Sequence, residues 1–182
     1  MTQAFLTKDG RSGVLRQIGQ DDAQEFVAAV DSVAREQIYF LRSKFDIDVA
    51  KEKAFLAQAV RDGNLVLGAI LEGQIVGWVT LFRARHEFRQ HVGELGMGVV
   101  AGFRDIGIGT TLMEAALAWA AENGFEKVNL GVRNNNHRAR ALYERFGFVQ
   151  EGHRVREIKD LDGCYHDCLE MAYAVPPGER KA

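Results

Sequence analysis

The sequence is poor in cysteine, has no excess of basic residues and contains no long apolar run. Two cysteines in 182 residues cannot form a disulfide framework, which favours a reducing compartment such as the cytoplasm. A formal net charge of −2 argues against a protein dedicated to nucleic acid, because such proteins are normally basic. No apolar stretch approaches the roughly twenty residues of a membrane helix, and residues 1–10 lack the apolar centre of a signal peptide. We therefore expect a cytoplasmic protein with neither nucleic acid nor a membrane as partner.

The sequence does contain a regular succession of amphipathic segments. Alternating or clustered apolar residues predict seven strands, at 14–18, 64–71, 74–82, 92–100, 127–132, 148–158 and 165–175. Helical spacing predicts four helices, which begin at Asp21 or Asp22, at Asp48, at Ile108 and at Asn136. In the second of these helices the spacing predicts the following buried residues: Val49, Phe55, Leu56 and Val60.

The order of these segments indicates the fold class. In the second half of the chain a helix lies between two strands, and such a crossover joins parallel neighbours in a sheet. Tight turns expected at Glu72-Gly73 and Asp162-Gly163 join antiparallel strands instead. We therefore expect one α/β (α+β) domain over residues 1–175, built on a mixed and mostly antiparallel sheet. Residues 176–182 are expected to form a loose tail.

A glycine-rich segment joins the strand at 92–100 to the helix at 108–122, and it reads Arg104-Asp105-Ile106-Gly107-Ile108-Gly109-Thr110. Such a turn exposes backbone N–H groups at the positive end of a helix, where an anion, and above all a phosphate, is stabilised. A P-loop requires lysine where Ile108 stands, which disfavours a nucleoside triphosphate. A dinucleotide fingerprint at 96–101 lacks the helix that should begin there. Taken alone, the segment also fits an ordinary turn between a strand and a helix.

Two sequence blocks together resemble the GNAT superfamily of N-acetyltransferases. The first, Arg104-x-x-Gly107-x-Gly109 after a strand, is similar to the acetyl-CoA-binding motif of that superfamily. The second is Asn136-x-x-Ala139-x-x-Leu142-Tyr143-x-x-x-Gly147-Phe148. The ending Asp162-Gly163-x-Tyr165-x-Asp167 is similar to that of bacterial amino-acid and ribosomal-protein acetyltransferases. The resemblance covers residues 12–174 and implies the GNAT fold, with about six or seven strands flanked by about four helices.

The resemblance also implies that acetyl-CoA is the co-substrate and assigns residues to its binding. Backbone N–H groups of the loop would hold the pyrophosphate, which makes the whole first block cofactor-binding: Arg104, Asp105, Ile106, Gly107, Ile108, Gly109 and Thr110. Main-chain groups of Val99 and Val100 would bind the pantetheine arm. Asn136 and Ala139 belong to the same set, as does Tyr143. Asn136 equally suits a helix cap, and the two roles are compatible.

Tyr143 and Glu94 are the candidate catalytic residues. Spacing alone favours a core role for Tyr143, whereas the resemblance places its hydroxyl beside the thioester sulfur as a general acid. A base is also required, because an alkylammonium has a pKa of about 10 and must lose a proton before it attacks. Glu94 lies near the position where several members of the superfamily carry a glutamate base. An exposed charge at a strand end is the plainer interpretation of Glu94, and water is an alternative base.

No metal site is expected. Cys164, His166 and Cys168 alternate along one strand, and three ligands so placed cannot readily converge on a tetrahedral zinc ion. Basic residues gather in the hairpin at 83–91, which we expect to be solvated, and they slightly favour an acceptor that carries a carboxylate.

These observations predict an N-acetyltransferase that moves the acetyl group of acetyl-CoA to a primary amine by direct attack through a tetrahedral intermediate. A non-catalytic acyl-CoA-binding or regulatory module of the same fold is the alternative. The acceptor is not specified by any motif, so a small molecule, an amino acid and a protein N-terminus all stay open. The resemblance directs the acceptor to residues 35–46 and 153–166. Homodimers are common among such proteins, and the sequence leaves that question open.

Overall fold

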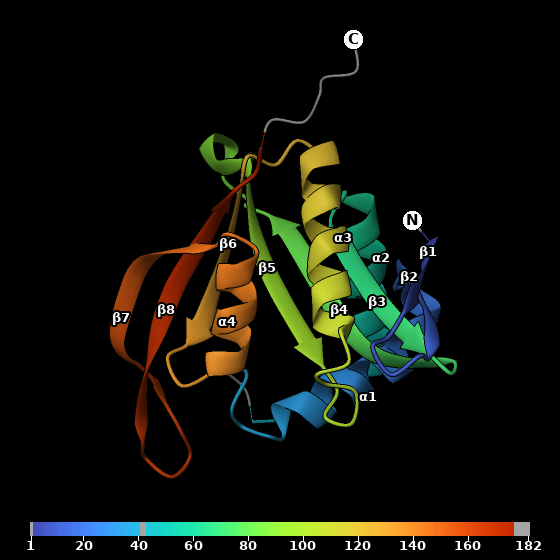
Figure 1. Ribbon diagram of the computed structural model, residues 1–182, viewed down its shortest axis with the longest axis horizontal. Helices are drawn as coiled ribbons and strands as arrows, with labels where there is room; N and C mark the ends of the chain where they lie inside the picture. Colours follow the sequence, from blue (N-terminus) through green and yellow to red (C-terminus); the bar gives the residue numbers. More distant parts are fainter. Residues whose placement is uncertain (1, 41–42, 177–182) are drawn as a thin grey trace.

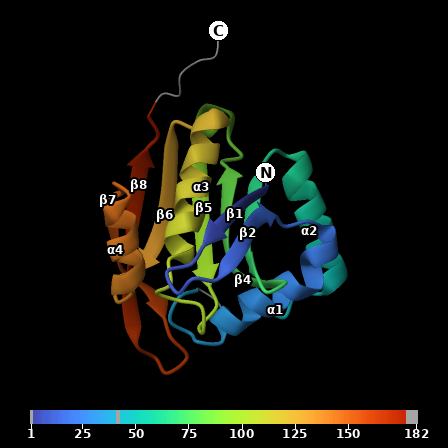
Figure 2. The same cartoon turned by 45° about the vertical axis from the view of Figure 1, so that its right-hand side comes forward.

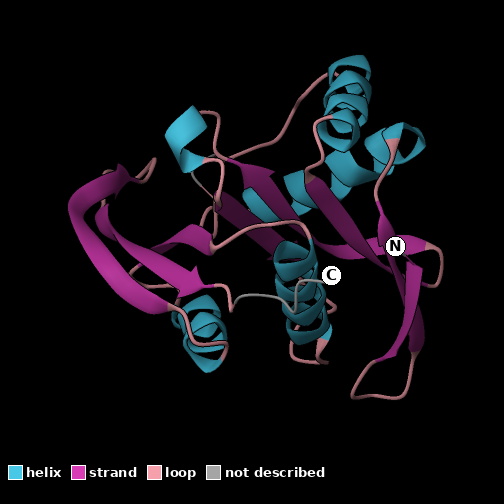
Figure 3. Ribbon diagram, turned by 90° about the horizontal axis from the view of Figure 1, so that it is seen from above, coloured by secondary structure: helices cyan, strands magenta, loops and turns pink. Residues whose placement is uncertain are grey.

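The computed structural model describes residues 2–40 and 43–176 and contains a mixed sheet with helices on both faces (Figure 1, Figure 3). The strands are β1 (Thr2–Leu6), β2 (Ser12–Gln17), β3 (Leu65–Leu71), β4 (Gln74–Arg83), β5 (Val92–Val99), β6 (Lys127–Arg133), β7 (Val149–Lys159) and β8 (Tyr165–Ala174). The helices are α1 (Ala23–Ala34), α2 (Val49–Arg61), α3 (Ile108–Glu122) and α4 (His137–Arg145), with 3-10 turns η1 (Gln20–Asp22) and η2 (Glu87–Arg89). The strands follow the order β1-β2-β3-β4-β5-β6-β8-β7. The predicted mixed fold is confirmed, with eight strands among the described residues rather than six or seven.

Two apolar clusters hold the helices against the sheet. On one face, α3 and α4 cover a cluster in which Leu67, Leu112 and Met113 are fully buried. On the opposite face, α1 and α2 pack over β3 and β4, where Phe26 meets the ring of Trp78 edge to face at 5.8 Å between centroids. Burial of these side chains supplies the main driving force for the fold. The α1 and α2 helices contact η1, β3, β4 and β5, which places them over the half of the sheet that contains β3 and β4.

The sheet opens between β5 and β6. These two strands pair in parallel over three residues only, from Val92↔Lys127 to Glu94↔Asn129. Beyond that point β5 pairs with β4 alone and β6 with β8 alone, so the strands diverge (Figure 1). The parallel pair and its crossover helix α3 were expected from the order of elements, and the opening leaves one edge of each strand without a neighbour.

Local signals in the sequence set the helix ends. The Asp48 side chain accepts hydrogen bonds from the N–H groups of Ala50 and Lys51 and so caps α2. The prediction for the buried face of α2 is wrong at two positions, because the side chains of Phe55 and Val60 are 46% and 51% exposed. Leu56 and Ala59 form the centre of the buried face, so Phe55 and Val60, each one position away, lie at its edge. Phe55 still contacts the sheet through the ring of Phe82, at 5.5 Å between centroids.

Strand β1 is absent from the sequence prediction. It forms a hairpin with β2, from Thr2↔Arg16 to Leu6↔Ser12, at one edge of the sheet (Figure 2). Its side chains are exposed except for a half-buried Phe5, so they show no apolar alternation that would indicate a strand. The expected loose tail falls almost entirely outside the described residues, which end at Pro176. Across the described part of the chain, no helix has the length and apolar character needed to cross a membrane.

Candidate functional site

A cavity of about 520 Å³ occupies the opening between β5 and β6. Tyr39 and Phe40, which follow α1, line it on one side of the sheet, and α4 lines it on the other. The rest of its wall comes from residues 95–99 of β5, the loop that leads into α3, Gly131 and Val132 of β6, and the side chains of Lys8 and Val33. The cavity therefore passes through the sheet, and two molecules can approach each other in it from opposite faces.

The β5–α3 loop presents free backbone donors to one end of this cavity. Among the described residues, none of the N–H groups of residues 104–110 donates a hydrogen bond to a protein acceptor. Gly107 takes a φ of 98° at the N-cap of α3, a left-handed conformation that glycine adopts without a steric penalty. Asp105 also has a positive φ, of 66°. Such unpaired N–H groups at a helix N-terminus form an anion site.

Three cations surround these donors, and sequence reasoning missed all of them. Lys8 is placed by the β1–β2 hairpin, where its backbone N–H donates to the Ile106 carbonyl at 2.9 Å. Arg145 donates to the Thr110 hydroxyl at 2.6 Å and forms no ion pair with a described residue. Arg138 is paired with the exposed Asp105 at 2.9 Å. The two arginines lie within the second sequence block, but their direction depends on how α4 packs beside the loop.

Arg104 lines the cavity but directs its charge elsewhere. Its guanidinium forms a bidentate ion pair with Glu36, at 2.5 and 2.7 Å, which raises the pKa of the arginine. Its Nε donates to the Val99 carbonyl at 2.9 Å, and the group lies over the ring of Tyr39 at 4.7 Å from the centroid. Arg104 thus links the β5–α3 loop to the segment that follows α1. Glu36 neutralises the guanidinium, so Arg104 adds no unpaired positive charge beside the free N–H groups of the loop.

The free edge of β5 is made by alternate residues. Val100 donates to the Val76 carbonyl, and Val92 accepts from Ala84, so even-numbered residues of β5 bond to β4. The backbone groups of Leu95, Met97 and Val99 must then face the opening. The predicted main-chain partners Val99 and Val100 therefore differ. The groups of Val99 face the opening, with its carbonyl bonded to Arg104, whereas the N–H of Val100 is taken by β4 and its side chain packs on the α1 face.

Tyr143 combines burial with access to the cavity. Its side chain is 6% exposed and packs against Phe148, with 5.8 Å between ring centroids. Burial raises the pKa of its hydroxyl to about 12, because the phenolate would lose hydration. The hydroxyl makes no hydrogen bond to another described residue, and Tyr143 lines the cavity. The two interpretations of the sequence are thus compatible, since the ring belongs to the core while the hydroxyl stays protonated and free to donate.

Asn136 and Ala139 lie beside Tyr143 on the cavity wall. The Asn136 side chain accepts from the N–H of Ala139 at 3.2 Å and so caps α4, as the sequence indicated. Its Nδ2 forms no hydrogen bond to a described residue and can still donate. Gly109 and Thr110 also line the cavity, whereas the side chain of Ile108, the first residue of α3, is buried in the core.

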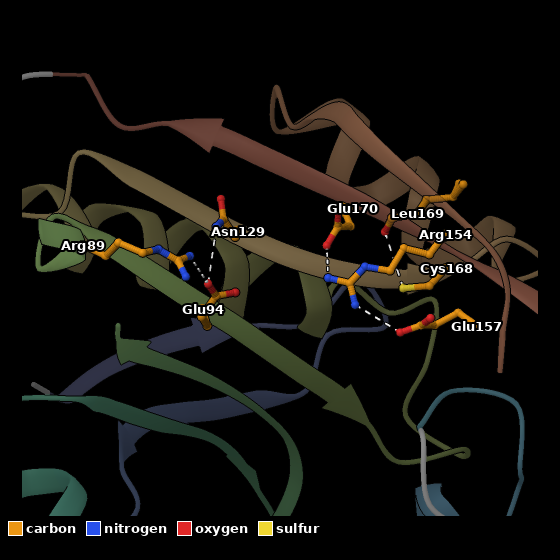
Figure 4. Close-up of polar contacts among 8 residues, drawn as sticks. All are labelled: Arg89, Glu94, Asn129, Arg154, Glu157, Cys168, Leu169 and Glu170. Carbon is orange, nitrogen blue, oxygen red and sulfur yellow. Dashed lines mark hydrogen bonds and ion pairs between the residues drawn. The ribbon is translucent and has the colours of Figure 1, made fainter. Parts of the chain in front are cut away.

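Glu94 lies at the closed end of the opening and does not line the cavity. It belongs to the last β5–β6 pair, two residues before Gly96, which does line the cavity. At about 3.3 Å per residue, its Cα lies roughly 7 Å from that of Gly96 along the strand. Glu94 lies on the same face of the sheet as Gly96, because two positions separate them along β5, and its side chain is 52% exposed. Figure 4 shows this side chain beside those of Arg89 and Asn129. Tyr143 therefore lines the cavity itself. Glu94 lies outside it, and a water molecule would be needed to connect the Glu94 carboxylate to a substrate bound in the cavity.

The remaining side chains considered in the sequence have structural partners. His166 bonds to Asp160 at 2.6 Å, and Asp160 also binds the buried Arg133 at 2.9 Å. Both cysteines are free, and no group of His, Cys, Asp or Glu within the described ranges is arranged to hold a metal ion. The predicted acceptor segment at 35–46 includes residues 41 and 42, which lie outside the described residues.

Comparison with known proteins agrees with this geometry. The model of the acetyltransferase (GNAT) family matches residues 27–148. An N-acetyltransferase of Archaeoglobus fulgidus is 32% identical over 138 residues, which are 71% of this chain and 88% of that protein. The ribosomal-protein-alanine N-acetyltransferase of Brucella melitensis has a TM-score of 0.81 and 25% identity, over 88% of this chain and 98% of that one. A phosphinothricin acetyltransferase of Sinorhizobium meliloti, solved with acetyl-CoA, shares the fold with a TM-score of 0.83 and 16% identity, over 93% and 92% of the two chains.

Proposed function

Since this chain belongs to the GNAT family of acyl-CoA-dependent N-acetyltransferases, we propose that it transfers the acetyl group of acetyl-CoA to a primary amine within the β5–β6 opening. The observation that carries the proposal is one cavity that joins the free N–H groups of residues 104–110 to the hydroxyl of Tyr143. The free cysteines support a reducing, cytoplasmic setting for this reaction.

The donor would bind along the free edge of β5. Its pyrophosphate would accept hydrogen bonds from the β5–α3 loop, with Lys8 and Arg145 adding positive charge. Its pantetheine amides would pair with the backbone carbonyl of Met97 and with the free amide of Asn136, so that the arm takes the place of the missing neighbour of β5. Val99 contributes less than its sequence position suggests, because Arg104 already bonds to its carbonyl.

The chemistry follows from the groups that remain free. The amine nitrogen attacks the thioester carbonyl carbon, a C–N bond forms, and the carbonyl electron pair moves to oxygen. The N–H of Met97 faces the opening and would stabilise that oxyanion. When the carbonyl re-forms, the C–S bond breaks and its electron pair leaves on sulfur, where the Tyr143 hydroxyl donates a hydrogen bond to the developing thiolate. An ammonium acceptor loses two protons. One leaves through water to Glu94 and then to solvent before the attack. The other is released from the nitrogen of the tetrahedral intermediate and passes by way of the Tyr143 hydroxyl to the sulfur, so the phenol is neutral again when the free thiol leaves.

Release of free thiol from acetyl-CoA, with a panel of amines, tests the proposal. The panel includes amino acids, polyamines, aryl-alkylamines and peptides with different N-terminal residues. We expect thiol release above the amine-free control with at least one acceptor class, and the product to be heavier than the acceptor by one acetyl group in mass spectra. Absence of CoA binding in calorimetry would refute the proposal. CoA binding with no turnover across the panel would favour the non-catalytic acyl-CoA-binding alternative.

A further inference from the structure

Two donors from different parts of the chain hold the same oxygen of Glu94. Arg89, in the 3-10 turn η2, donates to Oε1 at 3.1 Å, and Asn129, on β6, approaches the same atom with its amide Nδ2 at 3.4 Å (Figure 4). The second oxygen, Oε2, makes no hydrogen bond to a described residue. In Figure 4 it points away from both donors, along β5 in the direction of the opening. The carboxylate is therefore fixed through one oxygen and free at the other.

The amide of Asn129 has no other polar partner. Its Oδ1 is buried and accepts no hydrogen bond from any described residue. A buried acceptor without a donor destabilises a fold, because its hydration is lost and nothing replaces it. Exchange of the two amide atoms would turn the oxygen toward the carboxylate, so the orientation with Nδ2 on Glu94 is the favourable one. Among the described residues, the side chain of Asn129 thus bonds to Glu94 alone and leaves its buried oxygen without a donor.

Arg89 gives the basic hairpin a specific role. Its neighbour Arg83 packs over the ring of Phe125, at 4.0 Å from the centroid, and donates to the carbonyl of Asn123 at 2.7 Å. Arg85 is exposed and forms no hydrogen bond or ion pair with a described residue. Of these three arginines, only Arg89 contacts Glu94, so the loop that enters β5 is tied to that carboxylate through a single side chain.

From this geometry we infer that Arg89 and Asn129 are positioning residues that bind Oε1 of Glu94 and so leave Oε2 to accept the proton of the acceptor amine through water. The inference rests on the proposed acetyltransferase function. A carboxylate held by two donors loses the freedom to rotate, and a base that is already oriented needs less reorganisation in the transition state. Because Asn129 belongs to the last residue pair before the strands diverge, the same contact fixes Glu94 at the apex of the opening.

Double-mutant cycles with Glu94→Gln test the inference, with kcat and KM measured by thiol release. We expect Asn129→Leu and Arg89→Ala each to lower kcat by about 5- to 20-fold while KM for acetyl-CoA stays within twofold. In the Glu94→Gln background, each should lower kcat by less than about twofold, because their target no longer acts as a base. Arg89→Lys should recover part of the loss, and Arg85→Ala is the matched control that should leave turnover unchanged.

Stability provides the second readout. Asn129→Leu removes the unpaired oxygen, so its Tm should equal or exceed that of the wild type even as kcat falls. Equal losses of kcat with and without Glu94 would overturn the inference, and so would unchanged kcat in the single variants. Full activity of Glu94→Gln would overturn it while leaving the acetyltransferase function in place, whereas a wild type without turnover would overturn both. Should Asn129→Leu fail to fold, the exposed Arg89 and its control Arg85 decide the outcome.

Discussion

Replacement of Tyr143 by phenylalanine removes one oxygen from the cavity and leaves the aromatic packing against Phe148 intact. Burial holds the pKa of this phenol at about 12. The thiol of a leaving CoA has a pKa of about 8.5, so the phenol is the weaker acid by about 3.5 pKa units, or about 5 kcal/mol. Complete transfer of its proton to sulfur ahead of C–S cleavage is therefore uphill. Its main contribution is a hydrogen bond that strengthens as charge develops on sulfur.

This argument fixes the expected magnitude. A hydrogen bond to a charged group contributes about 1.5–3 kcal/mol, which corresponds to a fall in kcat of about 10- to 150-fold for Tyr143→Phe. KM for acetyl-CoA should change by less than about twofold, because the bond forms mainly in the transition state. Stability should be unaltered, since the hydroxyl bonds to no described residue.

The assay is thiol release at saturating amine, with Tyr173→Phe as the matched control. Tyr173 belongs to the same aromatic cluster, with its ring 5.4 Å from that of Phe148, but it does not line the cavity. We expect the control to retain wild-type kcat. Equal activity of the two variants would show that Tyr143 is only a core residue. A loss near 10⁴-fold would instead contradict the hydrogen-bond argument and indicate full proton transfer in the rate-limiting step.

Three further predictions concern stability and donor binding. Burial raises the pKa of Glu52, so Glu52→Gln should stabilise the protein by about 0.5–1 kcal/mol at pH 7. The gain should shrink as the pH falls and vanish below 4.5, where the glutamate becomes neutral in both the folded and the unfolded states. A gain that persists at low pH would contradict this cause. Lys8→Ala should weaken acetyl-CoA binding about fivefold in calorimetry, and by less in high salt. Replacement of the exposed Lys53 by alanine is the control. Equal affinities of wild type and Lys8→Ala would show that Lys8 does not belong to the site. Gly98→Ala would place its Cβ 2.5 Å from a tryptophan ring carbon and should cost about 1–3 kcal/mol in denaturant unfolding, whereas Gly102→Ala, which meets nothing within 4 Å, should be nearly neutral.

The parts of the site that depend on local backbone geometry could be predicted from the sequence. The glycines of the β5–α3 loop, the caps at Asp48 and Asn136, and the burial of Tyr143 all depend on residues a few positions apart. Motifs record such local requirements because a turn or a cap needs particular residue types at fixed spacing.

The parts that depend on distant partners could not be predicted. Arg104 was expected to belong to the phosphate-binding set, but the structure pairs its guanidinium with Glu36, 68 residues away. Glu94 and Asn129 are 35 residues apart, and their contact exists only because β5 and β6 are parallel neighbours. Lys8 was missed for a related reason, since the exposed strand that places it has no apolar alternation. Contacts between residues that are far apart in the sequence depend on which strands are neighbours in the sheet, and the pattern of apolar residues in the sequence does not reveal them.

The short pairing between β5 and β6 has a consequence for how the protein unfolds. The two halves of the sheet share three residue pairs along the strands that carry the opening, so few backbone hydrogen bonds couple them. A donor molecule that pairs with the free edge of β5 and contacts α4 would bridge the two halves and act as an additional structural element. A donor that binds only the folded protein stabilises it. When the free donor concentration is 100 times Kd, the free energy of unfolding rises by about 2.7 kcal/mol. Amide hydrogen exchange at the free edge of β5 should slow most on binding, and slower exchange in β6 as well would show that the bound substrate makes the two halves of the sheet unfold as one cooperative unit.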